Sequence, residues 1–180
     1  MRKTLTAYAF LLVIGGAVVL ADQATKHWVK THLALGEIRS LLSPIPWVNL
    51  VYWHNRGMAF GLGQTWGTAL LVLGAVYVVG ILLAFPRIAR YGSLVRWAIA
   101  IQWGGALGNL LDRWRHGVVT DFIMVGRFPV FNLADAAISL SVVLLLLNEW
   151  LQHREETEEP ETPAAPLTSS PPSDLSPHEH

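Results

Sequence analysis

Four long apolar stretches are the feature that most constrains the fold of this chain. They cover residues 4–21, 67–85, 94–112 and 133–151. A helix of about 20 apolar residues crosses the roughly 30 Å hydrocarbon core of a bilayer. Charged residues make up only 14% of the chain, against about 25% in soluble domains. The sequence therefore predicts an all-α membrane protein with four transmembrane helices, the second of which ends at Pro86.

The first stretch has a competing interpretation as a cleaved secretory signal. Its uncharged run is longer than the usual apolar core of a signal peptide, and no A-x-A cleavage site immediately precedes Asp22. These two features favour a first helix that is retained in the mature protein.

The charges around the stretches give a divided signal for orientation. Arg2 and Lys3 precede the first stretch, and three arginines crowd the short link before the third. In a four-span protein these two groups share one side, which the positive-inside rule makes cytoplasmic. Seven other cations fall on the opposite side, so counting alone does not decide. From the dense link and the first flank we expect both termini in the cytoplasm.

The remaining segments complete the predicted organisation. Residues 23–66 form a long outer segment, in which the aromatic and β-branched run 47–53 predicts a strand and the glycines of 56–63 indicate turns. Residues 152–180 are rich in Glu, Pro and Ser and predict a disordered, acidic cytoplasmic tail. The membrane domain therefore covers residues 1–151.

Acidic residues are scarce in the membrane domain, and half of them lie close together. Residues 1–151 hold six of the 13 acids, and three of these, Asp112, Asp121 and Asp135, fall within 24 residues. A carboxylate at a membrane boundary is costly to desolvate and is therefore a candidate functional group. The predicted topology gathers these polar residues on the outer face: Asp22, Asn55, Asp112, Asp121, Asn132 and Asp135.

Polar residues also recur on one face of the third and fourth predicted helices. The stripes consist of Gln102, Ala106, Asn109 and Arg113 on the third helix, and Asn132, Asp135 and Ser139 on the fourth. We expect both to face the bundle interior. Gly104 and Gly108 form a GxxxG pair that allows another helix to approach closely. From spacing alone, hydrogen bonds between helices without any catalytic role explain the stripes equally well.

The composition excludes some chemistries and gives others little support. The chain has no cysteine, which removes thiolate nucleophiles, disulfides and thiolate metal sites. A serine–lysine hydrolase would combine Ser40 or Ser43 with Lys26 or Lys30, but no surrounding signature supports it. A metal site would draw on His27, His32, His54 and His116. Their spacing matches neither HExxH nor a tight cluster, so we expect no metal ion and no cofactor.

A pair of carboxylates that share one proton is the chemistry best supported by these residues. Two like charges held close together cannot both ionise, so one carboxylate takes a proton from water while the other polarises a carbonyl. Each candidate also has a simpler explanation. Asp135 could stabilise a helix N-terminus, and Asp112 could form a salt bridge with Arg113 or Arg115. The residues alone do not tell which two of the three aspartates form the pair.

Five short motifs follow one another along residues 1–151. They are Asp22-Gln23-x-x-Lys26, Asn55-x-Gly57-x-Ala59-Phe60, Gly104-Gly105-x-x-Gly108-Asn109-x-x-Asp112-Arg113, Val119-x-Asp121-Phe122 and Phe131-Asn132-x-Ala134-Asp135. In this order they resemble the motifs of lipoprotein signal peptidase (signal peptidase II), a bacterial inner-membrane aspartic endopeptidase. No single motif suffices, and the resemblance rests on all five.

The resemblance implies a role for each matching position. Asp121 and Asp135 match the catalytic dyad, and Asp112 matches an aspartate that supports the site. Residues that hold the substrate backbone or globomycin-type inhibitors are matched by Asn55, Asn109, Arg113 and Asn132. The supporting positions around them are matched by Asp22, Lys26, Gly57, Gly108 and Ala134.

The resemblance also implies a reaction and a setting. The substrate would be a prolipoprotein cleaved before a cysteine that carries a diacylglyceryl group, with water as the nucleophile. The implied partners are this substrate, membrane lipid and globomycin-type inhibitors, with no nucleic acid, and we expect a monomer. Residues 23–66 would match the family's small extracytoplasmic β-cradle and its periplasmic helix.

Two other functional classes remain open from the residues alone. A small transporter would use the acids as an ion or proton path through the membrane. Polar residues would then run through its full depth, whereas here they concentrate in the outer half. A non-catalytic scaffold would use the Gly104–Gly108 pair as its contact with another helix.

Overall fold

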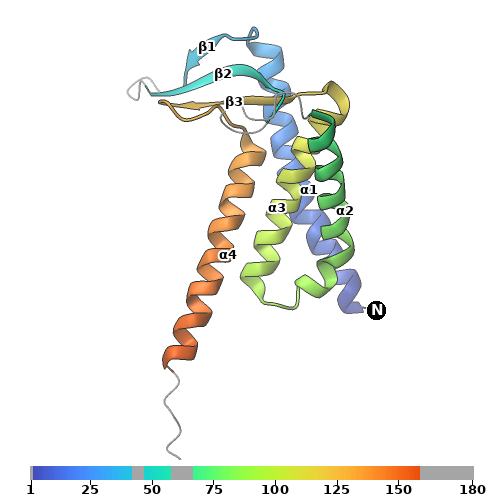
Figure 1. The fold of residues 1–180 in the computed structure, drawn as a ribbon. Coiled ribbons are helices and arrows are strands. Elements are labelled where there is room, and N and C mark those ends of the chain that lie inside the picture. The colour runs from blue at the N-terminus through green and yellow to red at the C-terminus, as the bar shows by residue number, and fades with distance from the viewer. Residues whose placement is uncertain (1, 42–46, 58–66, 159–180) are drawn as a thin grey trace, which may run out of the picture.

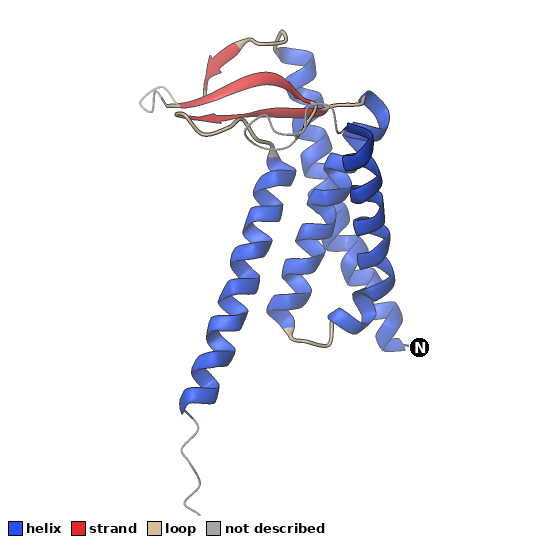
Figure 2. Ribbon diagram, viewed as in Figure 1, coloured by secondary structure: helices blue, strands red, loops and turns tan. Residues whose placement is uncertain are grey.

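Long helices and a small sheet make up the chain in a computed structural model, which describes residues 2–41, 47–57 and 67–158. The helices are α1 (Arg2–His32), α2 (Gly67–Ile88), α3 (Ser93–His116) and α4 (Leu133–Glu158). The strands are β1 (Ile38–Ser40), β2 (Val48–Asn55) and β3 (Val119–Val125). The helices run side by side, and the sheet lies across one end of them (Figures 1 and 2). The N-terminus and the α2–α3 link lie at the other end.

Three of the described helices, α1, α2 and α4, are long and apolar enough to cross a membrane. Their outward surfaces carry exposed apolar side chains, such as Val13, Val76 and Leu146, each about two-thirds exposed. An apolar surface of this extent suits contact with lipid rather than water. The third predicted span forms α3, which has a similar length but is more polar. It packs against all three other helices, which shield its polar side chains.

All four described helices extend beyond their predicted ends. α3 begins at Ser93 and continues to His116, where Gly117 in the left-handed conformation ends it. α1 continues to His32 because neither glycine nor proline interrupts residues 17–35. α2 passes Pro86 and ends at Ile88, since a proline in the last turn removes few backbone hydrogen bonds. The prediction of disorder from residue 152 is wrong for residues 152–158, which belong to α4. This segment consists mostly of good helix formers, and the first proline is Pro160.

The sheet is antiparallel with the order β1-β2-β3. The predicted strand at 47–53 corresponds to β2, whereas β3 was not predicted. The described part of residues 23–66 contains the end of α1, β1 and β2, and no separate periplasmic helix. Residues 58–63 of the predicted turn region, which include Ala59 and Phe60, lie outside the described residues.

An irregularity in the sheet lies beside Asp121. Leu50 pairs with Ile123 and Trp53 pairs with Asp121, so two residues of β2 oppose one residue of β3. Such a bulge bends a strand and redirects its side chains. The backbone N–H of Ile123 also donates to the carbonyl of Phe131, at 2.8 Å. This bond holds the start of α4 against β3.

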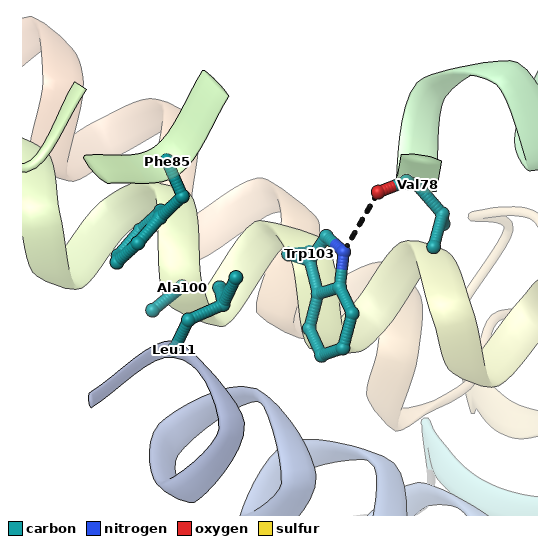
Figure 3. Close-up of a cluster of buried hydrophobic side chains, with 5 residues drawn as sticks. All are labelled: Leu11, Val78, Phe85, Ala100 and Trp103. Atoms are coloured by element: carbon teal, nitrogen blue, oxygen red, sulfur yellow. Dashed lines mark hydrogen bonds between the residues drawn. The ribbon is translucent and has the colours of Figure 1, made fainter. Parts of the chain in front are cut away.

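The apolar core lies between α1, α2 and α3, in the part of the bundle away from the sheet. Figure 3 shows its buried members: Leu11, Val78, Phe85, Ala100 and Trp103. The indole Nε1 of Trp103 donates to the carbonyl of Val78 at 2.9 Å, which satisfies its only polar atom. The core therefore fixes α3 against α1 and α2 without a buried charge.

Glycines on α3 allow close contact on two sides. A Cβ on Gly104 would lie 2.5 Å from the carbonyl oxygen of Gly15 in α1. A Cβ on Gly105 would lie 2.6 Å from the carbonyl oxygen of Ala134 in α4. Contacts this short do not occur for real side chains, so these positions need glycine. The close helix approach predicted at Gly104 is therefore confirmed, whereas the approach of α4 at Gly105 was not predicted.

We predict that Gly105→Ala destabilises the protein, because its methyl group must push α3 and α4 apart. Overpacking of this kind costs about 1–3 kcal/mol, or roughly 2–10 °C in Tm for a chain of this size. Thermal unfolding in detergent measures the loss. The matched control is Gly80→Ala on exposed α2 surface, where an added Cβ meets nothing within 4 Å. We expect this control to be neutral or stabilising, and equal losses in both variants would contradict the prediction.

Candidate active site

The carboxyl group of Asp121, on β3, is buried and receives two amide donors. Asn55 at the end of β2 donates its Nδ2 to Oδ2 at 2.9 Å. Asn132, immediately before α4, donates its Nδ2 to Oδ1 at 2.7 Å. The side chain is 1% exposed. Two segments that are distant in the sequence therefore position this one carboxyl group.

Asp135 lies in the first turn of α4 and forms a reciprocal cap with Asn132. The backbone N–H of Asn132 donates to Asp135 Oδ2 at 3.2 Å, and the N–H of Asp135 donates to Asn132 Oδ1 at 3.0 Å. This arrangement is a capping box, and the helix dipole there stabilises negative charge. The alternative role as a helix N-terminal charge is thus correct as local structure, and it does not exclude a catalytic role.

Two asparagine side chains connect the two carboxyl groups. Asn132 donates to Asp121 through its side chain and to Asp135 through its backbone. Asn109 of α3 donates its Nδ2 to Asp135 Oδ1 at 2.8 Å. Its Oδ1 accepts from Lys26 Nζ at 2.9 Å and from Asn132 Nδ2 at 3.1 Å. With its oxygen occupied by two donors, the Asn109 amide can only present its N–H group to Asp135.

Below these amides lies a buried ion cluster formed by Lys26 and two aspartates. Lys26 Nζ is 2.8 Å from Asp22 Oδ2 and 3.3 Å from Asp112 Oδ2. All three side chains are 1% exposed or less. Lys30 is 3.8 Å from Asp112 and is partly exposed. Asp112 therefore pairs with lysines of α1, and the predicted alternative of a bridge to Arg113 or Arg115 is wrong.

The same two aspartates accept backbone hydrogen bonds from neighbouring elements. Asp22 Oδ1 accepts from the N–H of Ala134 in α4 at 3.1 Å. Asp112 Oδ2 accepts from the N–H of Thr120 in β3 at 3.0 Å. The ion cluster thus joins α1 and α3 to the residues that precede Asp135 and Asp121 in the chain. Gly108 leaves room for it, because a Cβ there would lie 2.6 Å from Asp22 Oδ2.

Arg113 connects the end of α3 to the turn after β2. Its Nη2 donates to the carbonyl of Gly57 at 3.0 Å, and the N–H of Gly57 donates to Asn55 Oδ1 at 3.0 Å. Asn55 in turn donates to Asp121, so this chain of contacts ends at the carboxyl group. The Nε atom of Arg113 is buried and has no partner among the described residues.

The environment of Asp121 raises the pKa of its carboxyl group from 3.8 to about 6. Burial is the largest cause, and the nearby charge of Asp135 adds to it. The hydrogen bonds from Asn55 and Asn132 and the charge of Lys26 act in the opposite direction and are outweighed. Asp121 therefore retains its proton at a pH where an ordinary aspartate is ionised.

Not every predicted residue joins the site. Gln102 accepts a hydrogen bond from Tyr77 Oη at 2.7 Å and connects α3 to α2 instead. Ser139 is exposed, so its expected position in the bundle interior is wrong. Ser40 lies exposed on β1, Ser43 falls outside the described residues, and Lys26 is bound between carboxylates. The serine–lysine alternative therefore gains nothing from the described structure.

Sequence reasoning missed two contributors. Gln23 donates its Nε2 to the carbonyl of Gly108 and to Asp22 Oδ2, at 3.2 Å in both cases. Its position beside Asp22 in the first motif was the available signal. The second contributor is the backbone of Thr120, and a main-chain donor leaves no mark on residue type. Among the described residues, no group of three His, Asp or Glu side chains is placed to hold a metal ion.

Comparison with known proteins identifies the family. The family described as signal peptidase (SPase) II matches residues 14–151. The chain belongs to the signal peptidase II family. Proteins named lipoprotein signal peptidase from Syntrophomonas wolfei and Yersinia pseudotuberculosis are 39% and 40% identical to it. Each alignment covers 77% of this chain, and they cover 91% and 85% of the two relatives respectively.

Solved structures agree with this assignment. One described as a bacterial membrane enzyme has a TM-score of 0.74 and 29% identity, covering 84% of this chain and 93% of that one. A second with the same description has a TM-score of 0.68 and 30% identity. Membership of the signal peptidase II family makes the chain a peptidase. Its apolar helices make it a multi-pass membrane protein.

We predict that Lys26→Met strongly destabilises this signal peptidase II family member, because it leaves Asp22 and Asp112 buried without a counter-charge. Removal of one partner from a buried ion pair costs about 3–5 kcal/mol. Chemical or thermal unfolding in detergent measures the loss. Lys30→Met is the matched control, since Lys30 approaches Asp112 only at 3.8 Å and its side chain is 24% exposed. A loss no larger than that of the control would show that the cluster does not hold the fold.

Proposed function

We propose that this protein is a membrane aspartic endopeptidase that removes the signal peptide from diacylglyceryl-modified prolipoproteins. It would cleave the bond before the lipidated cysteine. Family membership and the name shared by its relatives support the substrate class. The single observation that carries the chemistry is the joining of Asp121 and Asp135 by Asn132, which donates to both. This geometry suits a pair of carboxylates that act together on one water molecule.

Within this pair we assign the proton to Asp121 and the negative charge to Asp135. Asp121 has a raised pKa of about 6. Asp135 accepts from Asn109 and from a backbone N–H at a helix N-terminus, which are contacts that stabilise a carboxylate. Asp135 would take a proton from water as the water oxygen attacks the scissile carbonyl carbon. Asp121 would donate its proton to the carbonyl oxygen, so that charge balances in the tetrahedral intermediate.

The surrounding polar residues would bind and orient the substrate peptide. Asn55 and Asn132 already hold Asp121, and Arg113 holds the turn at Gly57 close to Asn55. Amide and guanidinium donors of this kind suit the carbonyl groups of an extended substrate backbone or of a globomycin-type inhibitor. The ion cluster of Lys26 with Asp22 and Asp112 would act one layer further away, by fixing Asn109 and the backbones before the two catalytic aspartates.

We propose that α3 crosses the membrane as the fourth span, with the sheet at the outer face and both termini in the cytoplasm. α3 lies among the three apolar helices over most of its length (Figure 1). The exposed aromatic side chains Trp53, Trp114 and Phe128, at the sheet end, suit the level of the lipid headgroups. A substrate anchored by its diacylglyceryl group would reach the aspartates at this level, already confined to the membrane plane. The polar network occupies this end, whereas the buried core nearer the other end is apolar, which disfavours an ion path through the bilayer.

We predict that the purified protein cleaves a lipobox peptide only when its cysteine carries the diacylglyceryl group. Asp121→Asn and Asp135→Asn should each lower kcat at least about a hundredfold, the lower range of general acid–base contributions. Peptide cleavage followed by mass spectrometry measures both. Glu149→Gln is the matched control, because this exposed acid lies near the far end of α4 and should leave the rate unchanged. Cleavage by either aspartate variant at the wild-type rate would refute the dyad.

We also predict that kcat/KM falls as the pH rises, with a midpoint near pH 6. Asp121 must be protonated to donate to the carbonyl oxygen. Since its pKa is about 6, the active form is complete below this value and is lost above it, about tenfold per pH unit. Initial rates between pH 4 and 9 measure the profile. A rate that stays constant from pH 5 to 8 would contradict the assignment of the proton to Asp121.

The pH dependence of the unfolding free energy provides an independent test of the raised pKa of Asp121. The pKa of Asp121 has the ordinary aspartate value of 3.8 in the unfolded chain and is about 6 in the folded protein. Folding therefore favours the protonated form of this carboxyl group. The raised pKa therefore adds up to about 3 kcal/mol to the free energy of unfolding. This stabilisation is fully present below about pH 4 and is lost as pH rises through 6. Asp121→Asn should lack this part of the pH dependence. The variant should also differ from the wild type in stability at every pH, because the introduced amide side chain has only one acceptor oxygen for the donors of Asn55 and Asn132. The test therefore compares the pH dependence and not the absolute stability.

A further inference from the structure

A cavity of about 890 Å³ lies at the end of the bundle opposite the sheet. It is formed by the start of α1, the end of α2 and the start of α3, which meet at this end (Figure 1). The cations that line it are Arg2, Lys3, Arg87, Arg90 and Arg96. No aspartate or glutamate is among the lining residues. The volume is within the roughly 300–1,000 Å³ typical of ligand sites.

The same cavity has an apolar wall. Ala7 and Phe10 of α1 contribute one side of it, and Leu83 and Pro86 of α2 contribute the other. These residues continue into the apolar surfaces of α1 and α2, which are helices suited to the hydrocarbon core. A ligand that fits both parts of the cavity must therefore be amphiphilic, with an anionic group next to apolar chains.

Arg96 is the innermost cation of this set. Its guanidinium lies 4.7 Å from the ring centroid of Phe10, in a cation–π contact. Its Nε atom is buried and has no hydrogen-bond acceptor among the described residues. Arg2, Lys3, Arg87 and Arg90 are exposed around it. Arg96 thus lines the cavity and carries a buried donor without an acceptor among the described residues.

We infer that this cavity binds an anionic phospholipid of the phosphatidylglycerol class from the leaflet at this end of the bundle. Its phosphate would lie among the cations and accept from Arg96, while an acyl chain would follow the wall formed by Phe10 and Leu83. The positive-inside rule accounts for cations near the helix ends, but it does not require five of them around one cavity without an acid. Basic pockets between membrane helices are suited to anionic headgroups. The site is about one helix length from the aspartate pair and is independent of the proposed peptidase chemistry.

Two other anions compete for the same charges. The chain itself carries seven acidic residues after Leu151, and free phosphate shares the chemistry of the headgroup. The residues after Pro160 include five further prolines and few large apolar side chains, so they would make little contact with the apolar wall. Free phosphate has no apolar part that could contact this wall. The lipid satisfies both parts of the cavity, which is why we assign it.

The test compares thermal unfolding of the full chain in a nonionic detergent with added phosphatidylglycerol or phosphatidylcholine of identical acyl chains. We expect phosphatidylglycerol to raise Tm by about 3–5 °C more than phosphatidylcholine, as expected for a ligand that binds only the folded state. In Arg87→Gln/Arg90→Gln most of this difference should disappear. Both side chains are exposed, so we expect the double variant to fold. The quantity compared is the change in Tm caused by the lipid, which is independent of a small difference in Tm without lipid.

The matched control, Arg115→Gln/Arg127→Gln, removes two exposed arginines from the opposite end and should keep the full shift. Equal shifts with both lipids in the wild type would overturn the proposal, as would an equal loss in both double variants. If inorganic phosphate gives the same shift, the site binds phosphate alone and the lipid assignment fails. If a shift appears only after residues 159–180 are removed, the acidic tail is the occupant in the intact chain, and the lipid assignment fails likewise.

Discussion

The ammonium group of Lys26, buried between Asp22 and Asp112, is the interaction on which the rest of this structure depends. Burial of three charges is expensive, and such a cluster rarely adds net stability compared with apolar packing. Its value here lies in what the carboxylates do with their remaining oxygens. Each accepts one backbone N–H, from Ala134 or Thr120, and so fixes the chain next to a candidate catalytic aspartate. Loss of the central cation would release both segments together.

Close helix packing makes this ion cluster possible. Gly108 brings α3 against Asp22, and Gly105 brings α3 against the carbonyl of Ala134. A side chain at either position would separate helices whose polar groups must meet at hydrogen-bond distance. The glycines therefore serve the site as much as the fold, because the separation of α3 from its neighbours sets the position of Asn109. That amide can face Asp135 only while Lys26 and Asn132 hold its oxygen.

The sequence predicted the helices better than the contacts between the elements. The predicted apolar stretches each lie within a helix, since length and hydropathy are local properties. β3 was not predicted. Its sequence, VTDFIMV, includes Asp121, and the strand depends on pairing with β2 and Phe131, which are distant contacts. The partners of Asp112 were also predicted wrongly, as adjacent arginines instead of lysines about 80 residues away. Contacts across the fold carry no periodic signal, so residue type alone could not show them.

The difference between Asp121 and Asp135 likewise comes from the fold rather than from residue type. Asp135 is placed at a helix N-terminus, where a dipole and a backbone donor support negative charge. Asp121 is placed on a strand, buried, and next to that charge, so burial and this neighbouring charge raise its pKa to about 6. In the proposed mechanism this asymmetry divides the roles of base and acid between the two carboxyl groups. It needs only that a strand and a helix start meet at one asparagine, which the bond between Ile123 and Phe131 enforces.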